Sequence, residues 1–180
     1  MDQTAALEAL MNRVEQLENR VRIAEDIEAI QQLTARYCRA SDKLDVMPPD
    51  YVEHIAECFT EDGIWDGGPI FRAEGMEGFQ ELWGRGGERG ISFIIHRATN
   101  PVITVTGDTA RGLWHMLALV IEHGDALWTA GLYDNLYVRT PSGWKIKLMN
   151  YEPWFWSRHS QGWATERFRD FEAEQRLAAS

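Results

Sequence analysis

The stretch FIIHRATNPVITVTGDTARGLWHMLALVIEHG, residues 93–124, decides the fold. It is rich in β-branched and aromatic residues, and a Gly-Asp pair at 107–108 interrupts it, so it predicts two strands joined by a tight turn. Similar apolar runs, broken by turn residues, continue to residue 156. Both faces of these strands carry apolar side chains, which indicates a sheet with helices on one side and a curved interior.

The part of the chain before residue 91 has the spacing of helices. The pattern predicts a helix over 25–45 that ends before the consecutive prolines 48 and 49, and shorter helices over 50–59 and 75–86. A strand carrying Ile64 and Trp65 lies between the two short helices. Helices followed by a long antiparallel meander are typical of the α+β class.

The first residues have a different periodicity. Apolar side chains recur at alternating spacings of three and four from Leu7 to Ala24, which is the seam of a coiled coil. Two interpretations stay open, a helix docked on its own domain or a dimer contact. We divide the chain into an N-terminal helical extension at 1–22, a domain at 23–158 and a tail at 159–180 that has the pattern of a terminal helix.

Composition excludes several classes of partner. The formal net charge of −10 would repel a phosphate backbone, so we expect no nucleic acid. No apolar run approaches the roughly 20 residues that span a bilayer, so we expect a soluble protein without a membrane partner. Two cysteines without a disulfide pattern, and no secretory signal, indicate the cytoplasm.

His96 is the first candidate for chemistry, because it interrupts an otherwise apolar strand. Alternation places it on one face with Ser92 and Ile94, and Arg97 on the opposite face. An imidazole inside a concave sheet can act as a base. A satisfied structural histidine is the alternative.

Asp42 is the candidate partner of His96. It lies at the C-terminal end of the helix predicted over 25–45, where the helix dipole disfavours an acid. In one interpretation Asp42 stays in solvent, where Lys43 or Arg39 balances its charge. In the other, the carboxylate turns inward and holds the histidine.

The order of four segments resembles a known family: IQQLTARYCRASD (30–42), FTEDGIW (59–65), HRATNPVITVTGDTARG (96–112) and AGLYDNLYVRTPSGWKI (130–146). Together they are similar to the SnoaL-like branch of the nuclear transport factor 2-like (NTF2-like) superfamily, over roughly residues 25–152. The resemblance implies a cone-shaped, strongly curved antiparallel sheet wrapped around N-terminal helices, with a deep apolar pocket, as in an NTF2-like α+β barrel.

The resemblance also implies chemistry. Polyketide cyclases, scytalone dehydratase, bile acid dehydratase, a lindane dehydrochlorinase and cofactor-free aromatic lyases belong to this family. In several, an Asp on the first domain helix and a His on a central strand form an acid/base pair, often with a Tyr five residues before the Asp. The matching positions are Asp42, His96 and Tyr37. Some members carry an arginine in the last strand, where this chain has Met149 and Asn150.

Other side chains are candidates for binding a substrate. Eight tryptophans make an aromatic or polycyclic ligand more plausible than a sugar or amino acid. The candidate pocket residues are His115, Trp65, Trp114, Trp128, Asn150, Trp154 and Trp156. The alternative interpretation of His115 is a buried histidine with a structural role. His115 and His123 lie too far apart along one strand to share an ion, so we expect no metal. The resemblance to cofactor-free enzymes implies that no cofactor is needed.

The expected function is therefore a cofactor-independent lyase that removes water or a small carbon fragment, such as formaldehyde, from a hydroxylated aromatic, diaryl or polycyclic compound. An isomerase or a cyclase would use the same pocket. The non-enzymatic alternatives are a small-molecule binding module or a structural subunit like the β subunit of aromatic-ring dioxygenases. Apolar side chains on both sheet faces predict a homodimer or homotrimer.

Overall fold

The computed structural model describes residues 3–43, 50–68, 71–84 and 90–160. The tail predicted at 159–180 therefore lies largely outside the described residues. The elements are α1 (Gln3–Ser41), α2 (Tyr51–Ala56), β1 (Phe59–Asp66), β2 (Arg72–Glu74), α3 (Gly75–Phe79), the π-helical turn η1 (Gln80–Gly84), β3 (Ile91–Thr106), β4 (Thr109–Glu122), β5 (Asp125–Thr140) and β6 (Gly143–Arg158).

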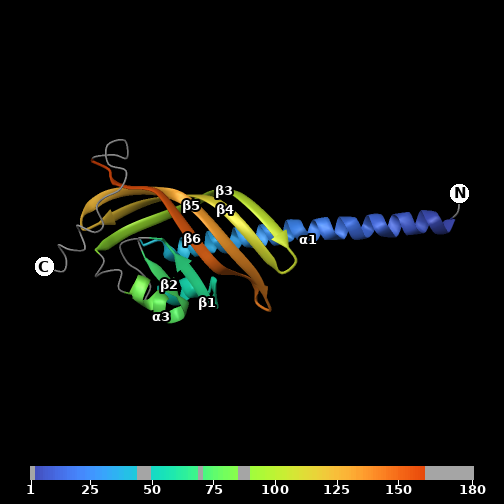
Figure 1. Ribbon diagram of the computed structural model, residues 1–180, viewed down its shortest axis with the longest axis horizontal. Helices are drawn as coiled ribbons and strands as arrows, with labels where there is room; N and C mark the ends of the chain where they lie inside the picture. Colours follow the sequence, from blue (N-terminus) through green and yellow to red (C-terminus); the bar gives the residue numbers. More distant parts are fainter. Residues whose placement is uncertain (1–2, 44–49, 69–70, 85–89, 161–180) are drawn as a thin grey trace.

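Six strands form one sheet in the described part of the chain, in the order β2-β1-β6-β5-β4-β3. The long strands β3 to β6 make an antiparallel meander that bends around α1 (Figure 1). This confirms the α+β class and the curved sheet wrapped around the N-terminal helix. The sheet is open rather than closed, and β1 pairs with β6 in parallel, which the antiparallel expectation did not include.

Turn chemistry fixes the register of the central hairpin. Glu122 pairs with Asp125, which leaves His123 and Gly124 as a two-residue loop. Both loop residues have positive φ, 51° and 86°, as a type I′ turn requires. From this turn the β4–β5 ladder continues without a bulge as far as the pair Thr109–Val138.

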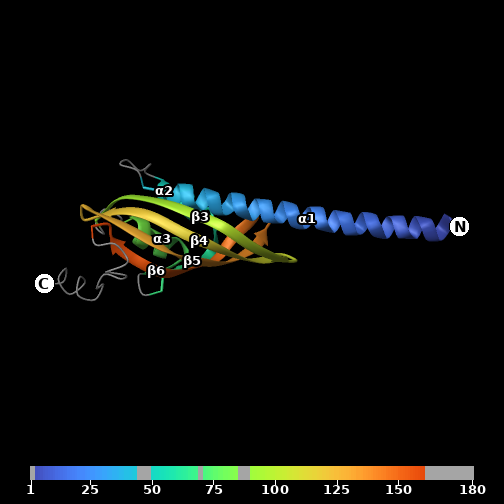
Figure 2. The same cartoon turned by 90° about the horizontal axis from the view of Figure 1, so that it is seen from above.

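The helix α1 is continuous across the two helical segments that the sequence predicts. Its C-terminal half lies in the concave face of the sheet, where Ile30, Leu33 and Tyr37 are at most 2% exposed. Its N-terminal half projects beyond the sheet (Figures 1 and 2). No described helix is long and apolar enough to cross a membrane.

Asp26 is the first side chain of α1 that the sheet buries. Its Oδ2 accepts a hydrogen bond from Arg139 Nη2 at 2.6 Å, and its Oδ1 accepts one from Trp144 Nε1 at 3.0 Å. The hydrogen bond from Arg139 holds the pKa of Asp26 below its usual range, against the opposing effect of burial. This carboxylate ties the helix to β5 and β6.

All five tyrosines of the chain have a raised pKa because of burial. Tyr137 shows how such a hydroxyl is accommodated: it accepts hydrogen bonds from Trp114 Nε1 at 3.0 Å and Asn135 Nδ2 at 3.1 Å, and lies 2.9 Å from Thr34 Oγ1. Burial disfavours the phenolate, so these groups stay protonated in the folded protein.

The substitution Asp26→Asn should reduce the free energy of unfolding at neutral pH by about 1–3 kcal/mol, because it removes a charged hydrogen bond. The folded-state pKa of Asp26 is depressed, so its stabilisation is present above the ordinary Asp pKa and is lost as pH falls through the folded value. Urea titrations should show the difference between wild type and variant shrinking in acid. Glu28→Gln, on the exposed side of α1, is the matched control and should change little; a constant difference at all pH values would contradict the assignment.

Alkaline titration should show no tyrosinate absorbance step near pH ~10 while the circular dichroism spectrum is native. Folded-state tyrosine pKa values are raised, so their stabilisation is present below the ordinary value and is lost as pH rises. Tyrosinate absorbance should therefore rise only together with unfolding. Protein denatured in guanidinium, as the control, should titrate near pH ~10. A step near that pH in native protein would show that the tyrosines are accessible.

Candidate active site

Two backbone hydrogen bonds connect the end of α1 to β3. The Lys43 N–H donates to the Ile94 carbonyl at 2.8 Å, and the Ile94 N–H donates to the Lys43 carbonyl at 2.9 Å. This isolated antiparallel bridge holds residues just past the helix against the strand that carries His96. Asp42, which lies between the end of the helix and the bridge, faces His96 for this reason.

Asp42 holds both the backbone and the ring of His96. Its Oδ1 accepts the His96 backbone N–H at 2.6 Å and lies 3.1 Å from His96 Nδ1. The side chains are only 18% and 11% exposed, which strengthens the interaction. A carboxylate at Nδ1 favours the tautomer with the proton on Nδ1, so Nε2 is the nitrogen available to a ligand. The carboxylate therefore turns inward, as the second of the two interpretations of Asp42 expects.

Arg97 lies on the other face of β3, as alternation predicts. Its side chain is 57% exposed, its Nη1 donates to the His96 carbonyl at 2.7 Å, and the same atom lies 3.9 Å from Asp42 Oδ2. The guanidinium thus adds positive charge behind the carboxylate without entering the pocket.

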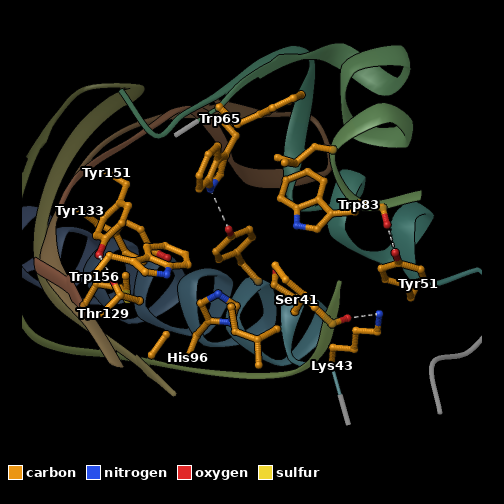
Figure 3. Close-up of a pocket in the computed structure, with 17 residues that line it drawn as sticks. Ser41, Lys43, Tyr51, Trp65, Trp83, His96, Thr129, Tyr133, Tyr151 and Trp156 are labelled. Atoms are coloured by element: carbon orange, nitrogen blue, oxygen red, sulfur yellow. Dashed lines mark hydrogen bonds between the residues drawn. The ribbon is translucent and has the colours of Figure 1, made fainter. Parts of the chain in front are cut away.

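Tyr37 projects from α1 beside His96, with ring centroids 6.5 Å apart. Figure 3 shows the side chains of His96 and Trp65 among those that line the same cavity. Its Oη accepts a hydrogen bond from Trp65 Nε1 at 3.0 Å and interacts with the hydroxyl of Tyr133. Burial raises the pKa of Tyr37, so the phenol remains a hydrogen-bond donor. Trp65 is fixed in turn by Gly67, where an added Cβ would lie 2.5 Å from the Trp65 ring.

A cavity of about 120 Å³ opens above His96 and Tyr37, inside the curved sheet. Its lining is mostly apolar, and its polar groups come from the end of α1, from α2 and from strands β3, β5 and β6. The apolar residues are Trp65, Phe71, Leu82, Trp83, Ile91, Ile94, Met116, Ala118 and Trp156, and the polar ones are Tyr37, Ser41, Lys43, Tyr51, His96, Thr129, Tyr133 and Tyr151. An apolar pocket with a few convergent polar groups is the usual form of a small-molecule site.

Four of the residues that the sequence singles out line this cavity, namely Tyr37, Trp65, His96 and Trp156. Asp42 contacts His96 from outside the lining. The structure therefore brings the predicted acid/base pair, the tyrosine and two of the predicted tryptophans together.

His115, a predicted pocket residue, lies instead on the outer face of the sheet. His115 is exposed, lies 3.0 Å from Asn100 Nδ2 through its Nδ1, and has its ring 5.5 Å from that of Trp154. The inward residues of β4 are the even-numbered ones, such as Met116 and Ala118, so His115 must point outward. The prediction that His115 lines the pocket is wrong, and so is its alternative as a buried histidine.

The prediction that Trp154 lines the pocket together with Trp156 is wrong, and a β-bulge separates the two residues. Pro153 pairs with Gly131 and Phe155 with Ala130, which leaves Trp154 as the extra residue. Tyr151 faces the cavity, so alternation turns Trp154 outward, where it is 44% exposed, and the bulge then brings Trp156 to the inner face.

Three further predicted pocket residues do not line the cavity. Trp114 is buried but donates to Tyr137, in the packed region under α1. Trp128 stacks on His159 with centroids 6.0 Å apart, on the outer face of β5. Asn150 pairs in register with Asp66 and Asp134 in neighbouring strands, and it also lies outside the cavity.

The residues predicted from the sequence do not include the polar wall formed by Thr129, Tyr133 and Tyr151. Thr129 Oγ1 and Tyr151 Oη lie 2.6 Å apart across β5 and β6. The strict alternation of β5, with odd-numbered residues buried from 127 to 137, carries a signal that could have grouped Thr129 and Tyr133 on one face.

Another missed feature is the rim contributed by Lys43, whose Nζ donates to the Ile91 carbonyl at 2.5 Å. Ser92, expected beside His96, is an exposed bulge residue, and Ile91 takes its place on the inner face. Within the described residues, no group of three or more His, Cys, Asp or Glu side chains could hold a metal ion.

Several solved structures share this architecture. A protein of Novosphingobium aromaticivorans, provisionally assigned as an aromatic ring hydroxylase, is 26% identical, with a TM-score of 0.67 over 75% of this chain and 94% of its own. A second protein of that organism, provisionally assigned as a scytalone dehydratase, is 20% identical, with a TM-score of 0.65 over 78% and 91%. A hexachlorocyclohexane dehydrochlorinase of Novosphingobium barchaimii is 23% identical, with a TM-score of 0.64 over 76% and 91%. The last two show the fold alone.

No curated protein sequence matches significantly. A family model described as a SnoaL-like domain matches residues 22–150, which include α1 from its buried half onward, the cavity and the Asp42–His96 contact. The chain shares its fold with an NTF2-like protein of Novosphingobium aromaticivorans, and by the family model it belongs to the SnoaL-like family.

Proposed function

We propose that the protein is a cofactor-independent lyase that removes water or a small carbon fragment from a hydroxylated aromatic, diaryl or polycyclic compound. The observation that carries this proposal is the pair of hydrogen bonds that Asp42 Oδ1 accepts from the backbone N–H and the Nδ1 of His96, at the edge of an aromatic cavity. The names of a dehydratase and a dehydrochlorinase among the similar structures support an elimination.

The pair of Asp42 and His96 supplies a base whose ring orientation is fixed. Nδ1–H is held by Asp42, so Nε2 takes a proton from the carbon or hydroxyl of the substrate that loses it. The carboxylate then stabilises the imidazolium. In an elimination of water, the electron pair of the broken C–H bond forms the double bond, the C–O bond breaks, and the proton on Nε2 passes to the departing hydroxide.

Tyr37 polarises an oxygen of the substrate. Its pKa is raised by burial, so the phenol does not compete with His96 as a base and instead donates a hydrogen bond to the oxygen where negative charge develops. Trp65 fixes the position of this hydroxyl. The substrate is thereby held between a base on β3 and a donor on α1.

The cavity favours flat apolar substrates. Trp65, Trp83 and Trp156 contribute rings from three different elements, and Trp65 and Trp83 meet edge to face with centroids 6.3 Å apart. Aromatic surface of this kind binds planar compounds and excludes water from the reacting atoms.

Location and assembly complete the proposal. Cys38 and Cys58 are free and buried, which suits a reducing cytoplasm. Self-association of the chain is also part of the proposal.

His96→Ala and Asp42→Asn should each reduce kcat about 10²–10⁴-fold, the usual contribution of a positioned acid/base group. The test is a mass-spectrometric screen of metal-free protein against hydroxylated diaryl, steroid and polyketide compounds. Wild type should release water or formaldehyde. The matched control is His115→Ala, the same change on the outer face of the neighbouring strand, which should keep full activity.

Full turnover by His96→Ala would rule out the acid/base role. An isomer or a ring-closed product without loss of mass would replace the lyase with an isomerase or a cyclase. Compounds that raise the melting temperature of all variants but are never converted would replace it with a binding module.

Tyr37→Phe should lower kcat roughly 10²–10³-fold, since it removes one donor to developing charge while keeping the ring. KM should change much less than kcat, because the donor acts mainly in the transition state. A purely structural role would instead leave kcat intact and lower only the melting temperature.

A further inference from the structure

The projecting half of α1, residues 3–24, exposes an apolar stripe. The side chains of Leu7, Leu10, Val14, Leu17 and Val21 are 45–59% exposed. Figure 2 shows this part of the helix extending away from the sheet. It also precedes nearly all of the SnoaL-like domain, which begins at residue 22, so the stripe is no part of the catalytic fold.

The stripe has the composition of a two-stranded seam. Leu7, Val14 and Val21 occupy the a positions of successive heptads, and Leu10, Leu17 and Ala24 occupy the d positions. Val at a with Leu at d favours parallel dimers over trimers. Most of the outward positions are polar, with Asn12 and Asn19 at f.

The flanking charges select an orientation. Arg13 and Arg20 occupy g positions, and Glu18 and Glu25 occupy e positions, and all four side chains are exposed. In a parallel, in-register pair, each g residue faces the e residue five positions later in the other helix. Arg13 would then face Glu18 of the second copy, and Arg20 would face Glu25. An antiparallel pair would place Arg beside Arg and Glu beside Glu.

The seam also points away from the domain. At about 100° per residue, the mean direction of the seam lies roughly opposite to that of the buried residues Asp26, Ile30, Leu33 and Tyr37. Two helices can therefore pair along the seam while each sheet stays on the outer side of its own helix.

We infer that residues 3–24 form a parallel, in-register two-stranded coiled coil with a second copy of this chain. The inference does not depend on the proposed function. It places two catalytic domains at the same end of the coiled coil, on opposite sides of it.

Sedimentation velocity and light scattering on the full chain at micromolar concentration test the seam. Wild type should have twice the monomer mass of 20.7 kDa. Leu10→Glu with Leu17→Glu should give a folded monomer, because charges replace the d positions. Asn12→Glu with Asn19→Glu adds the same residues to the same heptads at f and should stay dimeric. A monomeric or trimeric wild type, or a dimeric seam variant, would overturn the inference.

Exchanging the charges at the e and g positions tests which residues of the two helices pair. One variant carries Arg13→Glu with Arg20→Glu, and another carries Glu18→Arg with Glu25→Arg. Each alone should lose self-association, since like charges face one another, and an equal mixture should form a heterodimer. Two variants that each dimerise as wild type does, or a mixture that stays monomeric, would overturn the assigned pairs.

Oxidative cross-linking tests the orientation. Leu10→Cys places two thiols side by side at the d position of a parallel, in-register pair, so mild oxidation should give a covalent dimer. Asn12→Cys, at the outward f position, is the control and should cross-link poorly, and the native Cys38 and Cys58 are buried. Absence of a Leu10→Cys dimer under conditions where wild type is dimeric would overturn the parallel arrangement.

Discussion

The contact between the end of α1 and strand β3 holds the site together. Two backbone hydrogen bonds join Lys43 to Ile94, and the Asp42 carboxylate bonds the backbone and the ring of His96. Tyr37 stands on the same helix, so one helix and one strand position all three groups. The His96 ring therefore has little freedom to reorient, which is the form of preorganisation that the proposed proton transfer requires.

The interior of the sheet is divided into a packed end and an open end. At the packed end, α1 enters the sheet with Asp26 bound to Arg139 and Trp144, and the Tyr137 hydroxyl is satisfied by its neighbours. At the other end the helix stops at Ser41, and the strands continue past it. The last turns of α1 line this end with Tyr37 and Ser41, and aromatic side chains from the sheet and from η1 surround the rest of the cavity.

Local patterns predicted the fold class well, but they predicted the pocket walls poorly. The pairing of Asp42 with His96 was expected from the family resemblance, and the two side chains are in contact in the structure. His115 and Trp128 lie on apolar strands whose two faces are both hydrophobic, so alternation alone could not say which face is concave. Trp154 and Trp156 share one parity in the sequence, yet the bulge at Trp154 separates them. A bulge reverses the face of every residue beyond it and depends on the partner strand as well as on its own residues.

Local sequence patterns were enough to locate the long strands β3 to β6 and their turns, the helical character of the N-terminal part, and the heptad pattern with its charges at residues 7–25. These features depend on neighbours a few residues apart, whose effects act within one element. Only the tertiary structure decided that Asp42 meets His96, 54 positions away, and which aromatic side chains face the cavity. Both depend on strand register and sheet curvature, which are set by contacts between distant segments rather than by any single stretch.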